Sequence, residues 1–148
     1  MYLERTSSEN IFFQELIRQL DVVLKEVDGE QFDFLSQFNK VDAIKNVIVC
    51  FIGDQAVGCG AFKEYDSGIA EIKRMFVAPD YRAKGIASKI LEELEAWAKE
   101  LGFTQCILDT NKELKNAVQL YLNNGYVITA RYGQYVDVES SVCMKKNI

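Results

Sequence analysis

A short basic turn, expected between a strand and a helix, is the feature of this sequence that most limits its fold. The segment reads Arg-Ala-Lys-Gly-Ile-Ala at residues 82–87, between an apolar run and an amphipathic one. A helix that begins at such a turn directs unpaired backbone N–H groups and the positive end of its dipole at one spot. Gly85 lets a ligand approach the backbone closely, while Arg82 and Lys84 add positive charge. The segment predicts a phosphate or pyrophosphate site, with an ordinary strand-to-helix loop as the competing interpretation.

Hydrophobic periodicity predicts an alternation of strands and helices around this turn. Strands are expected at residues 1–6, 46–52, 56–65, 69–77, 105–109, 126–131 and 141–145. A helix is expected from a cap at Ser7 or Ser8 up to Gly29, and further helices are expected at residues 31–39, 85–101 and 115–123. This order of elements predicts an α/β layered domain with a mixed sheet.

Length and composition are those of one ordinary globular domain. The chain has 148 residues, 49% of them hydrophobic and 26% charged, so residues 1–148 are expected to share a single domain. The first residues lack a signal-peptide pattern, and the longest apolar run, residues 47–52, is too short to span a membrane. We therefore expect a cytoplasmic protein without a membrane partner. The net charge of −5, with scattered Lys and Arg, argues against a nucleic-acid partner.

The histidine and cysteine content of the chain limits the catalytic mechanisms that are possible. The chain contains no histidine, which excludes Ser-His-Asp and Cys-His mechanisms. Its four cysteines lack Cys-x-x-Cys spacing, so we expect buried, reduced thiols and no metal site. A general base must then be a carboxylate, a tyrosine, a lysine or water.

Three motifs in one order extend this interpretation. The strand-like segment 71–79, the turn 82–87, and the segment 116–126 with its Leu-Tyr and Gly-Tyr pairs together resemble the GNAT superfamily of N-acetyltransferases. The resemblance runs from Val47 onward to the C-terminus. It implies a GNAT-like mixed, mostly antiparallel sheet flanked by helices on both faces. Ala87 departs from the family's commoner glycine at the last position of the turn.

The resemblance also implies acetyl-CoA as a co-substrate, without a metal. In that family the turn holds the pyrophosphate, the preceding strand pairs with the pantetheine arm and supplies oxyanion N–H groups, and an asparagine holds the later helix against CoA. The implied contacts in this sequence are Phe76, Val77, Arg82, Lys84, Gly85, Ile86, Ala87, Ser88 and Asn116. The competing interpretations are a core strand at Phe76 and Val77 and a plain helix start at Asn116.

Two side chains match catalytic positions of the family. Glu71 lies where members with a glutamate base carry it, and Tyr121 matches the tyrosine that protonates the leaving thiolate. The competing interpretations for Glu71 are an ion pair with a lysine, a side chain that faces solvent, and ordered water as the base. For Tyr121 the competing interpretation is a core-packed ring. Strand alternation predicts one face with Glu71, Lys73, Met75 and Val77, and another with Ile72, Arg74 and Phe76.

The function that this resemblance implies is an N-acetyltransferase that moves the acetyl group of acetyl-CoA to a small-molecule amine. Alternatives are a non-catalytic acyl-CoA sensor or partner module, and an enzyme that acts on a protein amine. The segment 132–135 borders the acceptor pocket in the family, so we expect either a specificity element or a hairpin turn there. The oligomeric state is open, with a homodimer as one expectation because dimers are common among relatives.

Overall fold

The computed structural model describes residues 1–39 and 44–148. Its strands are β1 (Tyr2–Thr6), β2 (Asn46–Ile52), β3 (Gln55–Asp66), β4 (Ile69–Val77), β5 (Gln105–Asn111), β6 (Val127–Thr129) and β7 (Ser141–Asn147). Its α-helices are α1 (Ile11–Asp28), α2 (Phe32–Ser36), α3 (Ile86–Glu100) and α4 (Lys115–Asn123). Short 3₁₀ turns occupy Gly29–Gln31, Gln37–Asn39, Pro79–Tyr81 and Gly133–Tyr135.

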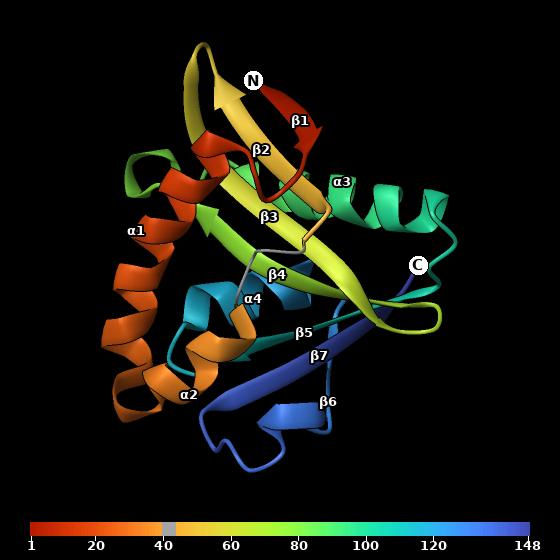
Figure 1. The fold of residues 1–148 in the computed structure, drawn as a ribbon. Coiled ribbons are helices and arrows are strands. Elements are labelled where there is room, and N and C mark those ends of the chain that lie inside the picture. The colour runs from red at the N-terminus through yellow and green to blue at the C-terminus, as the bar shows by residue number, and fades with distance from the viewer. Residues whose placement is uncertain (40–43) are drawn as a thin grey trace.

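One sheet runs through the described residues in the order β1-β2-β3-β4-β5-β7-β6. Neighbouring strands pair antiparallel, apart from β4 and β5, which pair parallel. Helices α1 and α2 pack on one face of this sheet, and α3 and α4 pack on the other (Figure 1). The predicted fold class, a mixed and mostly antiparallel sheet with helices on both faces, is confirmed.

Each face of the sheet has its own apolar core. On one face, Ile90 and Leu94 of α3 are fully buried against the strands. On the other face, Phe13 of α1 and Phe76 of β4 belong to one buried apolar cluster. Leu35 of α2 belongs to a smaller cluster that includes Cys143 of β7. Because both faces are covered, the middle strands contain nearly unbroken apolar runs, and β2 is buried over most of its length. In the two described ranges, no helix has the length and hydropathy to cross a membrane.

Strands β4 and β5 separate along their length, and this opens the sheet (Figure 1). They pair over three positions, from Ile69 with Gln105 to Glu71 with Ile107. Beyond these positions β4 continues to its end at Val77 without further pairing to β5 in the described chain. We call this opening the fork. On the side of the fork, the backbone N–H and C=O groups at the end of β4 therefore have no partner strand among the described residues.

A β-bulge in β4 changes the face on which the side chains after Lys73 lie, so the predicted alternation does not hold along the whole strand. Between successive pairings with β3, β4 carries one extra residue, and Arg74 there adopts a left-handed φ of 59°. Past the bulge, Met75 and Val77 pack in the core under α3. Glu71 and Lys73 face the opposite side of the sheet, toward α1 and α2. The predicted grouping of these four residues on one face is therefore wrong beyond Lys73.

Helix α1 begins later than expected. The predicted caps were Ser7 and Ser8, whereas the N-cap is Asn10, whose Oδ1 accepts the backbone N–H groups of Phe12 and Phe13 at 2.9 and 3.0 Å. Serine and asparagine are both good N-cap residues, so the position of the cap depends on where the chain turns into the helix after the end of β1.

Element ends elsewhere differ by a few residues. The strand expected at 105–109 continues to Asn111, because β5 pairs with β7 along its whole length. The strand expected at 126–131 shortens to β6, and the helix expected at 31–39 divides into α2 and flanking 3₁₀ turns. For the two strands, pairing partners far away in the sequence set these ends, and local propensity does not report them.

Candidate functional site

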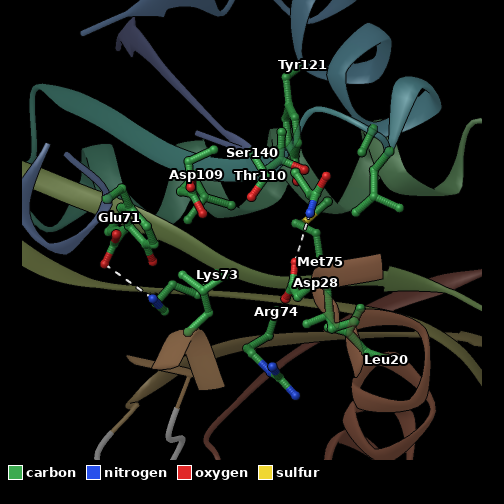
Figure 2. A pocket seen from close by; sticks show the side chains of 18 residues that line it. Leu20, Asp28, Glu71, Lys73, Arg74, Met75, Asp109, Thr110, Tyr121 and Ser140 are labelled. Atoms are coloured by element: carbon green, nitrogen blue, oxygen red, sulfur yellow. Dashed lines mark hydrogen bonds and ion pairs between the residues drawn. The ribbon is translucent and has the colours of Figure 1, made fainter. Parts of the chain in front are cut away.

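The fork holds a cavity of about 130 Å³, far larger than the roughly 10–15 Å³ that one water molecule needs. Its walls come from α1, α2, β4, β5, α4 and the residues before and at the start of β7 (Figure 2). The ionisable side chains that line it are Asp28, Glu71, Lys73, Arg74, Asp109, Tyr121 and Tyr135. Ionisable groups gathered in a cavity inside an apolar core mark it as the candidate functional site.

Glu71 is held by two partners inside the cavity and is only 2% exposed. Its Oε2 accepts the hydroxyl of Tyr132 at 2.7 Å, and its Oε1 lies 3.6 Å from Nζ of Lys73. Burial lowers the pKa of Lys73, and the charge of Glu71 opposes that shift. The structure therefore places the predicted base in the cavity with a partner on each oxygen.

Asp109 is a second carboxyl group at the fork. It follows the last residue pair of β4 and β5 by two residues and lies opposite Cys143 of β7. Burial raises the pKa of Asp109 to about 7, although hydrogen bonds with Ser141 and Cys143 and the charge of Lys73 act the other way. A carboxyl group with this pKa can gain and lose a proton near neutrality.

Tyr121 reaches the cavity from the other side of the sheet. It lies on α4, packs edge to face with Tyr126 at 5.8 Å between ring centroids, and still lines the fork (Figure 2). Burial raises the pKa of its hydroxyl, and the charge of Asp109 raises it further, so the phenol keeps its proton at neutral pH. The open fork thus brings the predicted acid, Tyr121, and the predicted base, Glu71, to one cavity.

The C-terminal end of α1 contributes a third carboxyl group. Asp28 is the last residue of this helix, and its Oδ1 accepts a hydrogen bond from Nδ2 of Asn111 at 2.9 Å. Burial raises the pKa of Asp28, and this hydrogen bond opposes the rise. Asn111 also accepts the backbone N–H of Glu113 at 2.9 Å, which fixes the loop from β5 to α4.

The predicted phosphate turn lies beside the end of β4, because Arg82 contacts Val77, the last residue of that strand. Ala83 and Gly85 have left-handed φ values of 61° and 78°. Gly85 is the N-cap of α3 and has no side chain to cap it, so N–H groups of the first turn remain for a ligand. A Cβ added at Gly85 would meet no atom within 4 Å, so the space beside the Gly85 backbone is open.

The two basic side chains of the turn are arranged differently. Nε of Arg82 donates to the carbonyl oxygen of Val77 at 2.8 Å, and its guanidinium lies 5.6 Å from the ring centroid of Phe76. Nζ of Lys84 lies 5.4 Å from the ring centroid of Tyr81. Arg82 therefore joins the turn to the end of β4, and both cations stay close to the start of α3.

Asn124 connects the two helices on this face. Its Nδ2 donates to Oγ of Ser88 at 3.1 Å and to the carbonyl oxygen of Leu120 at 2.8 Å. It thereby fixes the first turn of α3 against the last turn of α4. Asn116 is exposed in the first turn of α4, where both of its predicted roles remain compatible with its position.

The segment 132–135 contains the 3₁₀ turn Gly133–Tyr135, with Tyr132 as its N-cap. Tyr132 binds Glu71, while Tyr135 is buried and lines the cavity itself. The two tyrosine rings pack edge to face, 5.4 Å between centroids. The segment thus borders the candidate site, and its role as a specificity element stays a prediction.

Comparison with known proteins decides the family. The model of the acetyltransferase (GNAT) family matches residues 12–126, well over half of the chain. The chain belongs to the GNAT family. This confirms the resemblance that the three sequence motifs indicated.

Curated GNAT relatives match part of their own length. The uncharacterized N-acetyltransferase YsnE of Bacillus subtilis is 31% identical over 98 residues, which cover 65% of this chain and 65% of that protein. An IAA acetyltransferase from Azospirillum brasilense is 33% identical over 91 residues, covering 61% of this chain and 60% of that protein. The match therefore spans less than two thirds of each of these relatives.

Solved structures share the whole fold with this GNAT chain. A Klebsiella pneumoniae protein, provisionally assigned as an acyl-CoA N-acyltransferase, has a TM-score of 0.82 and 26% identity, covering 99% of this chain and 96% of that one. PaiA N-acetyltransferase from Thermoplasma acidophilum, solved in complex with coenzyme A, has a TM-score of 0.72 and 20% identity, covering 100% of both chains. At this lower identity the likeness concerns the fold.

Sequence reasoning missed part of this site. Asp28, Lys73 and Asp109 line the cavity, yet the sequence analysis gave none of them a role in the site. A signal for Asp109 was present, since a carboxylate inside a buried strand is uncommon without a partner or a function. Among the described residues, no group of three or more Cys, Asp or Glu side chains is placed to hold a metal ion.

Proposed function

We propose that this chain transfers the acetyl group of acetyl-CoA to the amine of a small molecule. The observation that carries the proposal is the fork cavity, which brings Glu71, Asp109 and Tyr121 together. The uncapped start of α3 follows the end of β4, one of the strands that form this fork. In a GNAT family member, this arrangement offers an anion site, a proton acceptor and a proton donor.

The turn before α3 has the properties that a CoA pyrophosphate requires. The proposed donors are backbone N–H groups from Lys84 through Ser88, with charge from Arg82 and Lys84. The open space at Gly85 leaves room for phosphate oxygens. The fork side of Phe76 and Val77 has no pairing from β5 in the described chain, so its polar backbone suits the amides of pantetheine.

The proton acceptor is proposed to be a carboxylate of the cavity. A primary alkyl amine has a pKa of roughly 10 and arrives protonated, so a proton must leave before attack. Glu71 is our proposed acceptor. Asp109 is the alternative in the same cavity, because its pKa of about 7 suits proton exchange at neutrality, while both oxygens of Glu71 already have partners.

Tyr121 is proposed to protonate the leaving group. As the amine nitrogen bonds to the acetyl carbon, the carbon–sulfur bond breaks and the sulfur leaves as a thiolate with a pKa of roughly 8.5. The phenol of Tyr121 retains its proton at neutral pH and can donate it to this sulfur. Backbone N–H groups at Phe76 or Val77 are the proposed donors to the oxyanion.

The size of the cavity favours a small acceptor. Its walls are buried and half-buried side chains from both faces of the sheet, and its volume of about 130 Å³ suits a few carbon and nitrogen atoms. A lysine side chain or N-terminus of a protein would need an exposed groove that leads to the same point. Transfer to a protein amine, and binding of acyl-CoA without transfer, are the other functions under consideration.

The test is release of the CoA thiol from acetyl-CoA in the presence of small primary amines and of amine-bearing peptides, together with calorimetric titration of acetyl-CoA. The proposal expects saturable binding and turnover with at least one small amine. Turnover with peptides alone would favour a protein-directed enzyme. Binding without turnover on any acceptor would favour a sensor, and no binding would overturn the proposal altogether.

A further inference from the structure

Two carboxyl groups of the fork cavity lack a cationic partner among residues 1–39 and 44–148. Neither Asp28 nor Asp109 has a lysine or arginine nitrogen of these residues within ion-pair distance. Figure 2 shows the two groups standing apart along the cavity. A partly buried carboxylate without a cation is costly, and a cationic ligand would offset that cost.

The spacing of the two groups follows from β5. Asp109 and Asn111 lie two residues apart on one strand, so their side chains share a face and are about 7 Å apart. Asn111 in turn holds Asp28 through the 2.9 Å hydrogen bond. Asp28 therefore lies further from the paired part of the fork than Asp109 does, on the same face.

The position of Asp28 is unfavourable for the free protein. A carboxylate at the last residue of α1 meets the negative end of the helix dipole, where a cation is preferred. Burial adds to this penalty. Asp28 is unfavourable for the helix and yet lines the cavity, which indicates that its carboxylate has a role in binding a ligand.

Apolar side chains form walls of the same cavity. The aliphatic lining residues are Leu20, Leu24, Leu35, Ile72, Leu114 and Ala117, from α1, α2, β4, α4 and the residue before α4. Such surfaces bury methylene groups of a ligand favourably. The cavity therefore combines aliphatic walls with two separated carboxyl groups.

Each of the two cations of the cavity has a carboxylate partner, although Nε and Nη1 of Arg74 are buried without a hydrogen-bond partner in the described part of the chain. Lys73 lies 3.6 Å from Glu71, and Nη2 of Arg74 contacts Asp21 at 2.8 Å and the carbonyl oxygen of Ile17 at 3.2 Å. The guanidinium of Arg74 also points away from Asp28 and Asp109 (Figure 2). Neither cation is placed beside Asp28 to receive a carboxylate at the far end of an acceptor.

We infer that the acceptor is a short linear aliphatic diamine, with one amine beside Asp109 and the other paired with Asp28. This inference rests on the proposed acetyl transfer. The reacting ammonium gives one proton to the cavity carboxylate, which is Glu71 or the alternative Asp109, and its nitrogen then bonds to the acetyl carbon. As the carbon–sulfur bond breaks, Tyr121 protonates the sulfur, and the second proton lost by the nitrogen restores the phenol of Tyr121. The distal amine stays an ammonium ion, so the product keeps one positive charge.

The experiment compares three acceptors in the thiol-release assay, each with a chain of about four carbon atoms: butane with an amine at each end, butane with one terminal amine, and γ-aminobutyric acid. We expect kcat/KM for the diamine to exceed that for the monoamine by about tenfold or more, as for one charge-assisted contact. We expect the amino acid to be the poorest acceptor, because its carboxylate would meet Asp28. Equal or better rates with the monoamine or the amino acid would overturn the inference.

A pair of variants assigns the preference to Asp28. Asp28→Asn keeps the shape and the acceptor oxygen for Asn111, and we expect the diamine-to-monoamine ratio of kcat/KM to fall about tenfold, mainly through KM. Glu26→Gln removes the same charge from an exposed position on α1 and should leave the ratio unchanged. An unchanged ratio in Asp28→Asn would overturn the role of Asp28.

The same data separate the two levels of proposal. Turnover with other amines, without preference for the diamine, would leave acetyl transfer standing and remove only the acceptor class. No turnover with any amine, despite binding of acetyl-CoA, would remove both.

Discussion

The hydroxyl of Tyr132 donates to Oε2 of Glu71 at 2.7 Å, across 61 residues of sequence. Burial and the charge of Glu71 both raise the pKa of Tyr132, so its hydroxyl stays protonated and remains a donor. With Lys73 at the other oxygen, this contact holds the Glu71 side chain in the fork. The turn before β7 thereby helps to build a site whose other parts lie on β4 and β5.

Tyr132→Phe should destabilise the protein by about 2 kcal/mol, because it removes a hydrogen bond to a buried carboxylate. Urea unfolding measures this free energy. Tyr65→Phe is the matched control, since Tyr65 is exposed and packs its ring edge to face against Tyr132. Equal stability of Tyr132→Phe and Tyr65→Phe would show that the contact contributes nothing.

Gly85→Asp should abolish binding of acetyl-CoA, because it places a negative carboxylate at the uncapped start of α3. The fold should survive, since a side chain at Gly85 has open space around it. Gly85→Ala is the control, because it carries the same backbone strain of roughly 1 kcal/mol at positive φ without the charge. Calorimetric titration of the folded variants gives the affinities, and normal affinity in Gly85→Asp would refute the placement of the pyrophosphate.

Tyr121→Phe should lower kcat by ~10²-fold and leave the affinity for acetyl-CoA nearly unchanged, as for loss of a general acid. Steady-state kinetics and titration separate the two effects. Tyr126→Phe removes the neighbouring hydroxyl, which donates to Glu95 at 2.8 Å, and should keep kcat. If Tyr121→Phe keeps full turnover, another group or water protonates the thiolate.

The pH profile of kcat/KM should identify the proton acceptor. A carboxylate base works only when ionised, so a rate that depends on Asp109 rises with pH through about 7 and then levels. Asp109→Asn should remove this rise if Asp109 is the base. Glu71→Gln should depress kcat/KM most near pH 7 and recover partly at high pH, where more of the amine is neutral, if Glu71 is the base.

The pH profiles of Asp109→Asn and Glu71→Gln distinguish the two candidate bases. The profile that changes shape belongs to the base, and the other variant should lower the rate at all pH values by a similar factor. Profiles that both overlay the parent's would exclude the two carboxyl groups and favour a chain of water molecules.

The sequence by itself determined the elements and the family. Strand β2 and helix α4 lie at the residues that periodicity predicted, because apolar spacing is a local signal that the chain carries whatever its surroundings. The turn at residues 82–87 likewise indicates an anion site from local backbone geometry alone. The ordered motifs then indicated the GNAT fold and placed Glu71 and Tyr121 as candidates.

Only the tertiary structure decided how these elements combine into a site. The extra residue at Arg74 reverses the strand alternation, and the parting of β4 from β5 lets Tyr121 reach a cavity on the far side of the sheet. Asp28 and Asp109 meet that cavity from distant segments. Such contacts depend on strand register and helix packing across long separations, and no local spacing in the sequence records them.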